Sequence, residues 1–365
     1  MGAFRGFYSR KRVFVTGHTG FKGSWLAEWL CSLGAEVHGY ALDPQAHELL
    51  FGQIGLESRL ASDTRADLMD RAALNDALRK AQPDVVLHLA AQPLVRLSYE
   101  QPVETFTTNV MGTVHLLDAV RLSGLPCTVV CITTDKCYEN REWLHAYREK
   151  DPMGGHDPYS ASKGAAEIAI SSYRRSFFHT GGSVKLASAR AGNVIGGGDW
   201  AFDRIVPDCI RAVRKGQPIQ VRNKVSTRPW QHVLEPLSGY LHLAASLASR
   251  QKPEAMASAF NFGPQLSSNR TVAELVDELL KSTGGEWIDA SSADARHEAG
   301  RLNLAIDKAF HLLQWEPVWN FEETVSRTAE WYLAEDSGGS PLESTRNQIA
   351  AYQEMAMVKG LAWTR

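Results

Sequence analysis

The sequence has almost no net charge, and no region is dominated by charge of one sign. Its 365 residues include 39 Lys and Arg against 41 Asp and Glu, which leaves a formal net charge of −2. Proteins that bind nucleic acids depend on a basic field, and neither such a field nor an acidic tail is present. We therefore expect no nucleic-acid partner.

The sequence also lacks long apolar runs and an even number of cysteines. The N-terminal stretch MGAFRGFYSRKR lacks the apolar run of a signal peptide, and no later run is long enough to cross a membrane. The 5 cysteines are odd in number and have no metal-ligand spacing, which favours reduced thiols and no bound metal. These features predict a soluble cytoplasmic protein with no membrane partner.

A glycine-rich turn near the N-terminus lies between a predicted strand, residues 12–16, and a predicted helix, residues 25–33. Glycines let the backbone approach a pyrophosphate, and the N-terminus of the helix supplies N–H groups and positive potential. The alternative is an ordinary tight turn. The pattern predicts dinucleotide binding by Gly17, His18, Thr19, Gly20, Phe21, Lys22 and Gly23.

Asp43 indicates which dinucleotide is bound, because it lies about twenty residues past the glycine loop, after a predicted strand at residues 35–41. A carboxylate there binds a ribose and repels a 2′-phosphate, so we predict NAD rather than NADP. The alternative is that Asp43 and Pro44 form only a turn. Further cofactor contacts are expected from strand ends and from the next long helix, at Asp67, Leu68, Ala90, Gln92 and Asn109.

Predicted strands alternate with helices through the first 190 residues, which indicates an α/β fold with a doubly wound parallel sheet of the Rossmann kind. After residue 190, short strands mix with helices, as expected for a smaller mixed α/β substrate-binding lobe. We expect the NAD-binding domain at residues 1–190, with a return segment near 225–258. The lobe then covers residues 191–224 and 259–335, and a C-terminal tail covers 336–365.

Tyr159 and Lys163 lie one turn apart on a predicted helix that begins after Asp157 and Pro158, a capping acid and a first-turn proline. An ammonium beside a phenol favours the phenolate, so this pair predicts a proton acceptor that works near neutral pH. The alternative is a surface tyrosine with an ordinary lysine neighbour.

Seven stretches resemble the extended short-chain dehydrogenase/reductases, and more closely the nucleotide-sugar 4,6-dehydratases. The resemblance covers residues 12–320, nearly the whole chain except the tail, and the Thr-Asp-Lys triplet and the GNVIGGGDW loop are its most specific parts. The stretches are TGHTGFKGSWL, AAQPLVRLSYEQP, TNVMGTVHLL, TTDKCYENREW, DPYSASK, RAGNVIGGGDW and RPWQHVLEPLSGY.

The resemblance implies that a sugar is oxidised at C4 by bound NAD⁺, that water leaves across C5 and C6, and that the hydride returns to C6. Tyr159 would be the base at the C4 hydroxyl, Lys163 would assist it, and Thr134 would bond the C4 oxygen. Asp135 would protonate the departing hydroxyl. Asn109 matches a position that shapes the site, although a polar residue that bends its helix is the alternative.

Elimination of an unactivated hydroxyl needs a neighbouring carbonyl and a second acid and base, which Asp135 and Lys136 can supply. The alternative is that these two residues form an exposed turn. Thymidine-linked relatives place a glutamate at the position of Lys136. A lysine can remove the C5 proton only as the neutral amine, so we hypothesise that part of Lys136 is neutral. If it stays charged, it would stabilise the enolate instead.

The resemblance further implies CDP-glucose as the substrate, used for deoxysugars of surface polysaccharides. Guanidinium groups suit a diphosphate. The expected substrate-binding residues are Arg96, Asn193, Arg204, Arg228 and His297. We also expect a homodimer or homotetramer formed through helices at residues 102–122 and 157–178, which relatives commonly pair.

Two other functions remain open. A 4-epimerase on the same fold would keep Tyr159 and Lys163 but would not need Asp135 and Lys136. A non-catalytic NAD-binding protein would be free to lose Tyr159 or Lys163, and this chain retains both.

Overall fold

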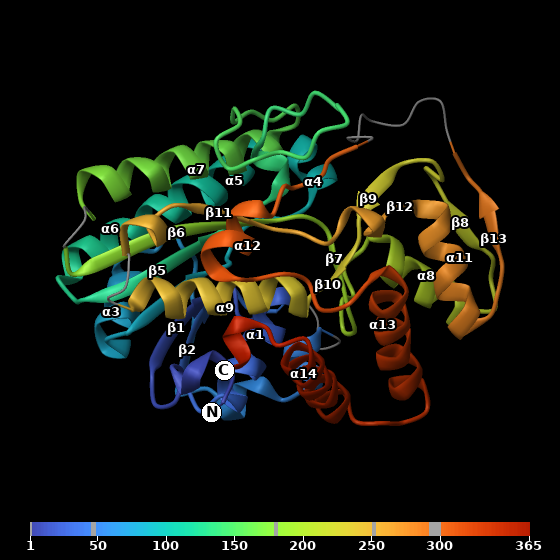
Figure 1. The fold of residues 1–365 in the computed structure, drawn as a ribbon, viewed down its shortest axis with the longest axis horizontal. Coiled ribbons are helices and arrows are strands. Elements are labelled where there is room, and N and C mark those ends of the chain that lie inside the picture. Colours follow the sequence, from blue (N-terminus) through green and yellow to red (C-terminus); the bar gives the residue numbers. More distant parts are fainter. Residues whose placement is uncertain (1, 45–48, 179–181, 250–252, 292–300) are drawn as a thin grey trace.

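A seven-stranded parallel sheet forms the centre of the computed structural model, which describes residues 2–44, 49–178, 182–249, 253–291 and 301–365 (Figure 1). The strand order is β11-β6-β5-β4-β1-β2-β3, and each neighbouring pair is parallel. The predicted doubly wound parallel sheet is therefore confirmed. Its strands are β1 (Arg12–Thr16), β2 (Glu36–Ala41), β3 (Ser62–Arg65), β4 (Val85–His88), β5 (Cys127–Ile132), β6 (Val184–Ala191) and β11 (Ala259–Phe262).

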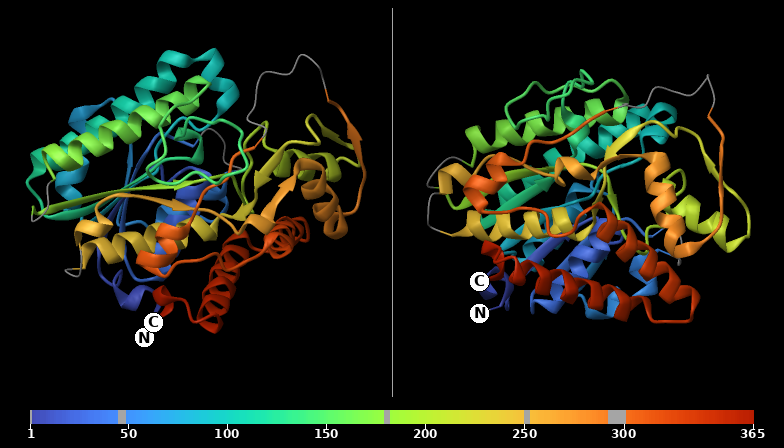
Figure 2. Two further views of the ribbon diagram at one scale, coloured as in Figure 1. Left: turned by 45° about the horizontal axis from the view of Figure 1, so that its top comes forward. Right: turned by 45° about the vertical axis from the view of Figure 1, so that its right-hand side comes forward.

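The sheet is covered on both faces, which explains why its central strands are apolar along their whole length. On β4, Val85 and Leu87 belong to one apolar cluster, whereas Val86 between them belongs to another on the opposite face. One face packs against α1 (Phe21–Ser32) and α9 (Leu234–Ala248). The other packs against α3 (Arg71–Ala81), α6 (Gly112–Ser123) and α7 (Pro158–Ser176), as Figures 1 and 2 show.

One expected boundary differs from the structure. Residues 259–262 were expected in the smaller lobe, but β11 is the edge strand of the main sheet. It pairs in parallel with β6, with Phe260 opposite Ala189 and Asn261 opposite Arg190. α9 packs on the sheet, and the short helix α10 (Pro253–Met256) follows it before β11, so the return segment extends through β11.

The smaller part of the structure lies beyond the carboxyl ends of the main strands (Figure 2). Its helices include α8 (Ile205–Arg214), α11 (Val272–Thr283) and α13 (Phe321–Asp336). It contains three two-stranded pairs among the described residues: β7 (Val194–Ile195) with β10 (Gln231–His232), β9 (Thr227–Pro229) with β12 (Asn269–Thr271), and β8 (Ile219–Val221) with β13 (Trp287–Asp289). β7 lies within the glycine-rich stretch that was expected to contain no strand.

Short helices connect the larger elements of the main sheet and the smaller part. The helix expected at residues 102–122 consists of α5 (Pro102–Phe106), a π-helical turn (Thr107–Met111) and α6. The other short helices are α2 (Leu50–Gln53), α4 (Val95–Glu100), α10 (Pro253–Met256) and α12 (Asp307–Leu313).

The expected C-terminal tail contains α14 (Pro341–Val358), which packs against α1 and α13. Ser340 caps this helix by accepting a hydrogen bond from the Glu343 N–H. Beyond it, the Trp363 ring stacks on Phe4, with 5.1 Å between centroids, and on Tyr352, with 5.9 Å. These contacts bring the two chain ends together (Figure 1).

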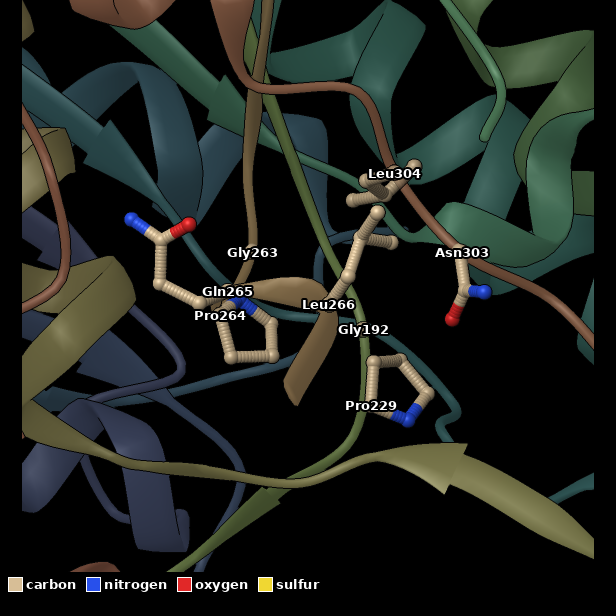
Figure 3. A pocket seen from close by; sticks show the side chains of 8 residues that line it. All are labelled: Gly192, Pro229, Gly263, Pro264, Gln265, Leu266, Asn303 and Leu304. Atoms are coloured by element: carbon tan, nitrogen blue, oxygen red, sulfur yellow. The ribbon is translucent and has the colours of Figure 1, made fainter. Parts of the chain in front are cut away.

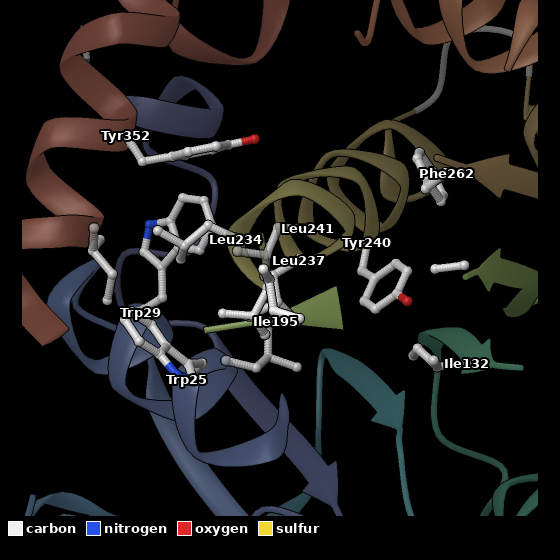
Figure 4. Packing of buried hydrophobic residues seen from close by; sticks show 14 of the residues in the cluster. Trp25, Trp29, Ile132, Ile195, Leu234, Leu237, Tyr240, Leu241, Phe262 and Tyr352 are labelled. Carbon is white, nitrogen blue, oxygen red and sulfur yellow. The ribbon is translucent and has the colours of Figure 1, made fainter. Parts of the chain in front are cut away.

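α9 contributes Leu234, Leu237, Tyr240 and Leu241 to the largest apolar cluster (Figure 4). The same helix carries a buried carboxylate, Glu235. Glu235 accepts hydrogen bonds from the N–H groups of Val318 (2.9 Å) and Trp319 (2.7 Å) and from the Tyr352 hydroxyl (2.7 Å). Burial nevertheless raises the pKa of Glu235 to about 7, since the hydrogen bonds only partly offset desolvation. This carboxyl links α9 to the C-terminal helix.

Among the residues that the structure describes, no helix combines the length and apolar character that a membrane span requires.

We predict that Glu235 makes stability depend on pH near neutrality. Because its folded pKa exceeds the ordinary glutamate value of 4.5, its stabilising contribution is complete below that value and is lost as pH rises through about 7. Between these limits, the free energy of unfolding should fall by about 3 kcal/mol more in the natural protein than in Glu235→Gln. Urea unfolding at a series of pH values measures this. Parallel curves for the two proteins would contradict the prediction.

Candidate functional site

The glycine loop between β1 and α1 lies directly against the end of β4. Gly17 has a φ of +74°, and a Cβ there would come within 2.7 Å of the Ala90 nitrogen. A Cβ on Gly23 would come within 2.0 Å of the Gly17 carbonyl oxygen. Gly20 precedes α1 and provides no side-chain cap, so the first-turn N–H groups are available to an anion.

The loop is tied to the ends of β2 and β3. His18 is buried; its ring lies over Gly39, and its Nε2 is 2.8 Å from Asp63 Oδ1. The Thr19 hydroxyl donates a hydrogen bond to the Leu42 carbonyl (3.1 Å), and the next residue, Asp43, is exposed. Phe21 and Lys22 form the first turn of α1.

The other residues expected at the cofactor lie at strand ends along the same edge. Asp67 and Leu68 follow β3, and Leu68 packs so closely on α6 that a Cβ on Gly112 would lie 2.8 Å from it. The Ala90 N–H donates to the Thr16 hydroxyl (3.2 Å). Gln92 Nε2 donates to Thr105 Oγ1 (2.9 Å).

Asn109 connects two parts of the site from the π-helical turn. Its Oδ1 accepts the Gln92 N–H (2.8 Å), and its Nδ2 donates to the Gln92 carbonyl (3.1 Å) and to the Ser162 hydroxyl of α7 (2.8 Å). A π turn is a common feature of functional sites because it redirects side chains. Asn109 therefore joins the end of β4 to the helix that carries Tyr159.

Thr134, Asp135 and Lys136 follow β5 at the same edge of the sheet. They were expected to be catalytic and are called here the catalytic triplet. The Thr134 hydroxyl donates to Asp135 Oδ1 (2.9 Å). Burial raises the pKa of Asp135, while the charge of Lys136 opposes the shift. A Cβ on Gly192 would lie 2.8 Å from Asp135 Oδ2, so the loop after β6 meets this carboxyl directly.

The helix start predicted from Asp157 and Pro158 is confirmed. Asp157 Oδ1 accepts the Ser160 N–H (2.9 Å), and Pro158 is the first residue of α7. Tyr159 and Lys163 are both buried on the inner side of this helix. α7 also packs against the turn that contains Asp135 and Lys136, which brings the triplet and the tyrosine–lysine pair to one site.

The pKa of Tyr159 differs from the expectation. Burial raises it to about 12, although the Thr134 hydroxyl and the charge of Arg204 lower it. Burial also lowers the pKa of Lys163 to about 8, which the nearby Cys131 and Glu167 partly oppose. The predicted depression of the phenol pKa by Lys163 is absent here because desolvation outweighs the attraction between charges.

Two of the five expected substrate residues carry charges that shift the pKa values of Tyr159 and Asp135. Arg204 is held by Asp199 (2.8 Å) and lowers the pKa of Tyr159, whereas Arg228 lowers that of Asp135. Arg96 is half exposed and pairs with Asp203 (3.1 Å). Asn193 is half-buried in the loop after β6, and His297 lies outside the described residues.

Lys22 lies close to the charges of Arg204, Asp135 and Lys163. The sequence predicted Lys22 only as part of the glycine loop and did not indicate these neighbours. Burial lowers its pKa to about 8; Arg204 and Lys163 reinforce this shift and Asp135 opposes it. The first turn of α1 thus brings a cation close to the catalytic triplet.

A small pocket is lined by the segments that follow β6 and β11 and by Pro229 of β9 (Figure 3). Gly192 in its wall adjoins the Asp135 carboxyl. The Asn303 side-chain oxygen is buried there without a hydrogen-bond partner among the described residues, so it is available to a donor on a ligand. The pocket is lined by Gly192, Pro229, Gly263, Pro264, Gln265, Leu266, Asn303 and Leu304. The part of the chain that the structure describes contains no cluster of three metal-ligating side chains.

Comparison with known proteins identifies close relatives. A family model described as GDP-mannose 4,6 dehydratase matches residues 14–328. The CDP-glucose 4,6-dehydratase of Salmonella typhimurium is 47% identical over 354 residues, which cover 95% of this chain and 98% of the relative. The dTDP-glucose 4,6-dehydratase of Xanthomonas campestris is 28% identical over 283 residues, 74% of this chain and 78% of the relative.

Solved structures share the fold with both dehydratases and epimerases. A dTDP-glucose 4,6-dehydratase from Streptomyces venezuelae, with NAD and TYD bound, has a TM-score of 0.75 at 24% identity; the match covers 90% of this chain and 99% of that one. A UDP-glucose 4-epimerase from Thermotoga maritima has a TM-score of 0.76 at 21% identity, covering 89% and 99%. Fold alone therefore does not separate the two activities.

Proposed function

Because the chain belongs to the nucleotide-sugar 4,6-dehydratase family, we propose that it converts CDP-glucose to CDP-4-keto-6-deoxyglucose with NAD as cofactor. The observation that carries this proposal is 47% identity to a CDP-glucose 4,6-dehydratase over 95% of the chain. The substrate comes from this relative, because the pocket geometry itself does not select a base.

The glycine loop supports a dinucleotide. The close contacts of Gly17 with Ala90 and of Gly23 with Gly17 leave no space for a Cβ, and the uncapped start of α1 offers N–H groups to a pyrophosphate. Bound NAD⁺ would supply a hydride acceptor for C4 and later return the hydride to C6. Asp43 would bind the ribose, and Asp67, Leu68, Ala90, Gln92 and Asn109 would line the rest of the site.

In the oxidation step, Tyr159 takes the proton of the C4 hydroxyl, and Thr134 hydrogen-bonds the C4 oxygen. A phenol with a pKa near 12 keeps its proton at neutral pH and cannot accept another. Nearby positive charge must lower this pKa before Tyr159 can act as a base. We assign that role to Lys163 and Arg204.

In the elimination step, Asp135 protonates the leaving C6 hydroxyl. Its raised pKa supports this role, because an acid must hold its proton until the leaving oxygen arrives. We assign removal of the C5 proton to Lys136, which follows Asp135 in the chain and is half-buried.

The remaining expected groups bind substrate. Arg228 and Arg204 suit the diphosphate, since both come from the smaller part and reach the catalytic charges. Asn193 and His297 are proposed near the sugar and diphosphate, and Arg96 is the weakest of the set because it pairs with Asp203. We place the enzyme in the cytoplasm, in deoxysugar synthesis for surface polysaccharides such as lipopolysaccharide O-antigen.

We also propose that the protein is a homodimer or homotetramer. The outer sides of α5, the π turn and α7 expose apolar side chains that a second copy would cover. These side chains are Val103 (70% exposed), Phe106 (39%), Met111 (44%), Ile168 (62%) and Phe177 (50%).

The first prediction of this proposal concerns the reaction. Purified protein should release NAD(H) when denatured and should convert CDP-glucose to a product with the alkaline absorbance of a 4-keto sugar. dTDP-glucose and UDP-glucose serve as comparison substrates. Interconversion of CDP-glucose and its C4 epimer would show an epimerase instead, and NAD binding without turnover of any of these sugars would show a non-catalytic protein.

The second prediction concerns Lys136. Lys136→Met should still oxidise C4 and accumulate bound NADH, but it should stop before elimination and incorporate almost no deuterium at C5 from deuterated water. Lys150→Met, an exposed lysine in the same connecting segment, is the control and should retain full turnover. Normal C5 exchange in Lys136→Met would show that this lysine is not the base.

The third prediction concerns assembly. Ile168→Glu places a charge in the proposed interface and should shift the protein to smaller species in light scattering at micromolar concentration. Val358→Glu changes an equally apolar residue, 79% exposed at the end of α14, and should leave the assembly unchanged. A natural protein that is only monomeric under these conditions would overturn the proposal.

A further inference from the structure

Glu167 is a buried carboxylate on α7, one turn beyond Lys163. Its Oε1 accepts a hydrogen bond from the Thr133 hydroxyl (2.6 Å). Its Oε2 accepts hydrogen bonds from the Ser188 hydroxyl (2.9 Å) and from Arg190 Nη2 (2.7 Å). Each of these side chains is at least nine-tenths buried. One carboxylate thus joins α7 to the ends of β5 and β6.

The carboxylate is ionised. Burial raises its pKa, but Arg190 and the two hydroxyls reverse this effect, and the net pKa of Glu167 is lowered. Hydrogen bonds to a charged acceptor are short and directional, and loss of one partner of a buried ion pair is strongly destabilising. The position of Glu167 between the two strands is therefore firmly fixed.

Arg190 extends the network to the far side of the catalytic triplet. Its Nη1 donates to the Tyr138 hydroxyl (2.7 Å) and to the Glu149 carbonyl (3.0 Å). The Tyr138 hydroxyl in turn donates to Asn261 Oδ1 (2.7 Å) on β11. Thr133 precedes the triplet and Tyr138 follows it after Cys137, so the segment is held on both sides.

We propose that Glu167 is a positioning residue that, through Thr133 and Arg190, sets the distance between the catalytic triplet and the Tyr159–Lys163 pair. This inference rests on the proposed function. Tyr159 acts at C4 and Asp135 at C6 of one sugar ring, so the spacing of these groups decides whether oxidation leads on to elimination. A shift of the triplet weakens oxidation only through the hydrogen bond of Thr134 to the C4 oxygen, because Tyr159 on α7 stays at C4. The same shift moves both groups that elimination needs, Asp135 and Lys136, away from C6 and C5.

A second buried carboxylate shows that such pairs need not serve the site. Glu28 on α1 is fully buried and binds Arg59 and Arg346. Those partners lie in the turn before β3 and on α14, away from the triplet and the Tyr159–Lys163 pair. The Glu167 network differs because Thr133 directly precedes Thr134 in sequence and Glu167 lies one helical turn from Lys163.

Two variants separate positioning from general stability. Thr133→Val is nearly isosteric and removes the hydrogen bond to Oε1, while the Glu167–Arg190 pair remains. Ser188→Ala removes the other hydroxyl from the same carboxylate, at an equally buried site on β6. We expect Thr133→Val to lower kcat about 10- to 100-fold, with little change in KM, and to accumulate bound NADH in the steady state. Ser188→Ala should retain the natural kcat and cofactor state.

Amide hydrogen exchange supplies a readout that does not depend on the substrate. Thr133→Val should speed exchange in residues 134–138, and Ser188→Ala should not. Natural protein that fails to act on CDP-glucose would refute the proposed function, and the exchange data would still test the inference. Normal kcat and unchanged exchange in Thr133→Val, or equal effects in both variants, would overturn the positioning role.

Discussion

A buried carboxylate is stable only where donors and positive charge surround it, and Glu167 meets this condition where β5, β6 and α7 converge. Parallel strands are spaced about 4.8 Å apart, so groups at the ends of neighbouring strands have fixed relative positions. The ion pair between Arg190 on β6 and Glu167 on α7 holds the helix at a fixed position relative to these strand ends. Tyr159 and Lys163 consequently take their positions from the sheet as well as from their own helix.

The expected cofactor side of the site depends on close backbone contacts, which are possible because glycines there have no side chains. Gly17 and Gly23 allow the loop to turn against β4, and Gly192 allows the loop after β6 to touch Asp135. Close backbone contact at these points brings the two parts of the structure to the same edge of the sheet. Ligands of doubly wound folds bind at this edge because the strands end there and the first turns of helices face outward.

Local signals predicted much of this arrangement from the sequence. The Asp157 cap, the glycine loop and the alternating strands each depend on neighbouring residues, and the structure contains all three. The membership of β11 in the main sheet depends on pairing with β6, which no local pattern encodes. The helix α14 was missed in the expected tail, and its packing on α1 depends on residues distant in sequence. The pKa of Tyr159 was missed because residue spacing does not report burial.

Dehydratases and epimerases share this fold, so the activity must follow from a few side chains and from their protonation states. Two buried carboxyls near the Tyr159–Lys163 pair illustrate the point. Glu167 receives an arginine and two hydroxyls, and its pKa is lowered; Asp135 is buried beside the Thr134 hydroxyl, and its pKa is raised. The first shift favours the anion that holds the structure, and the second favours the protonated form of the carboxyl. An epimerase needs only the redox pair, whereas elimination of water also needs an acid of this second kind.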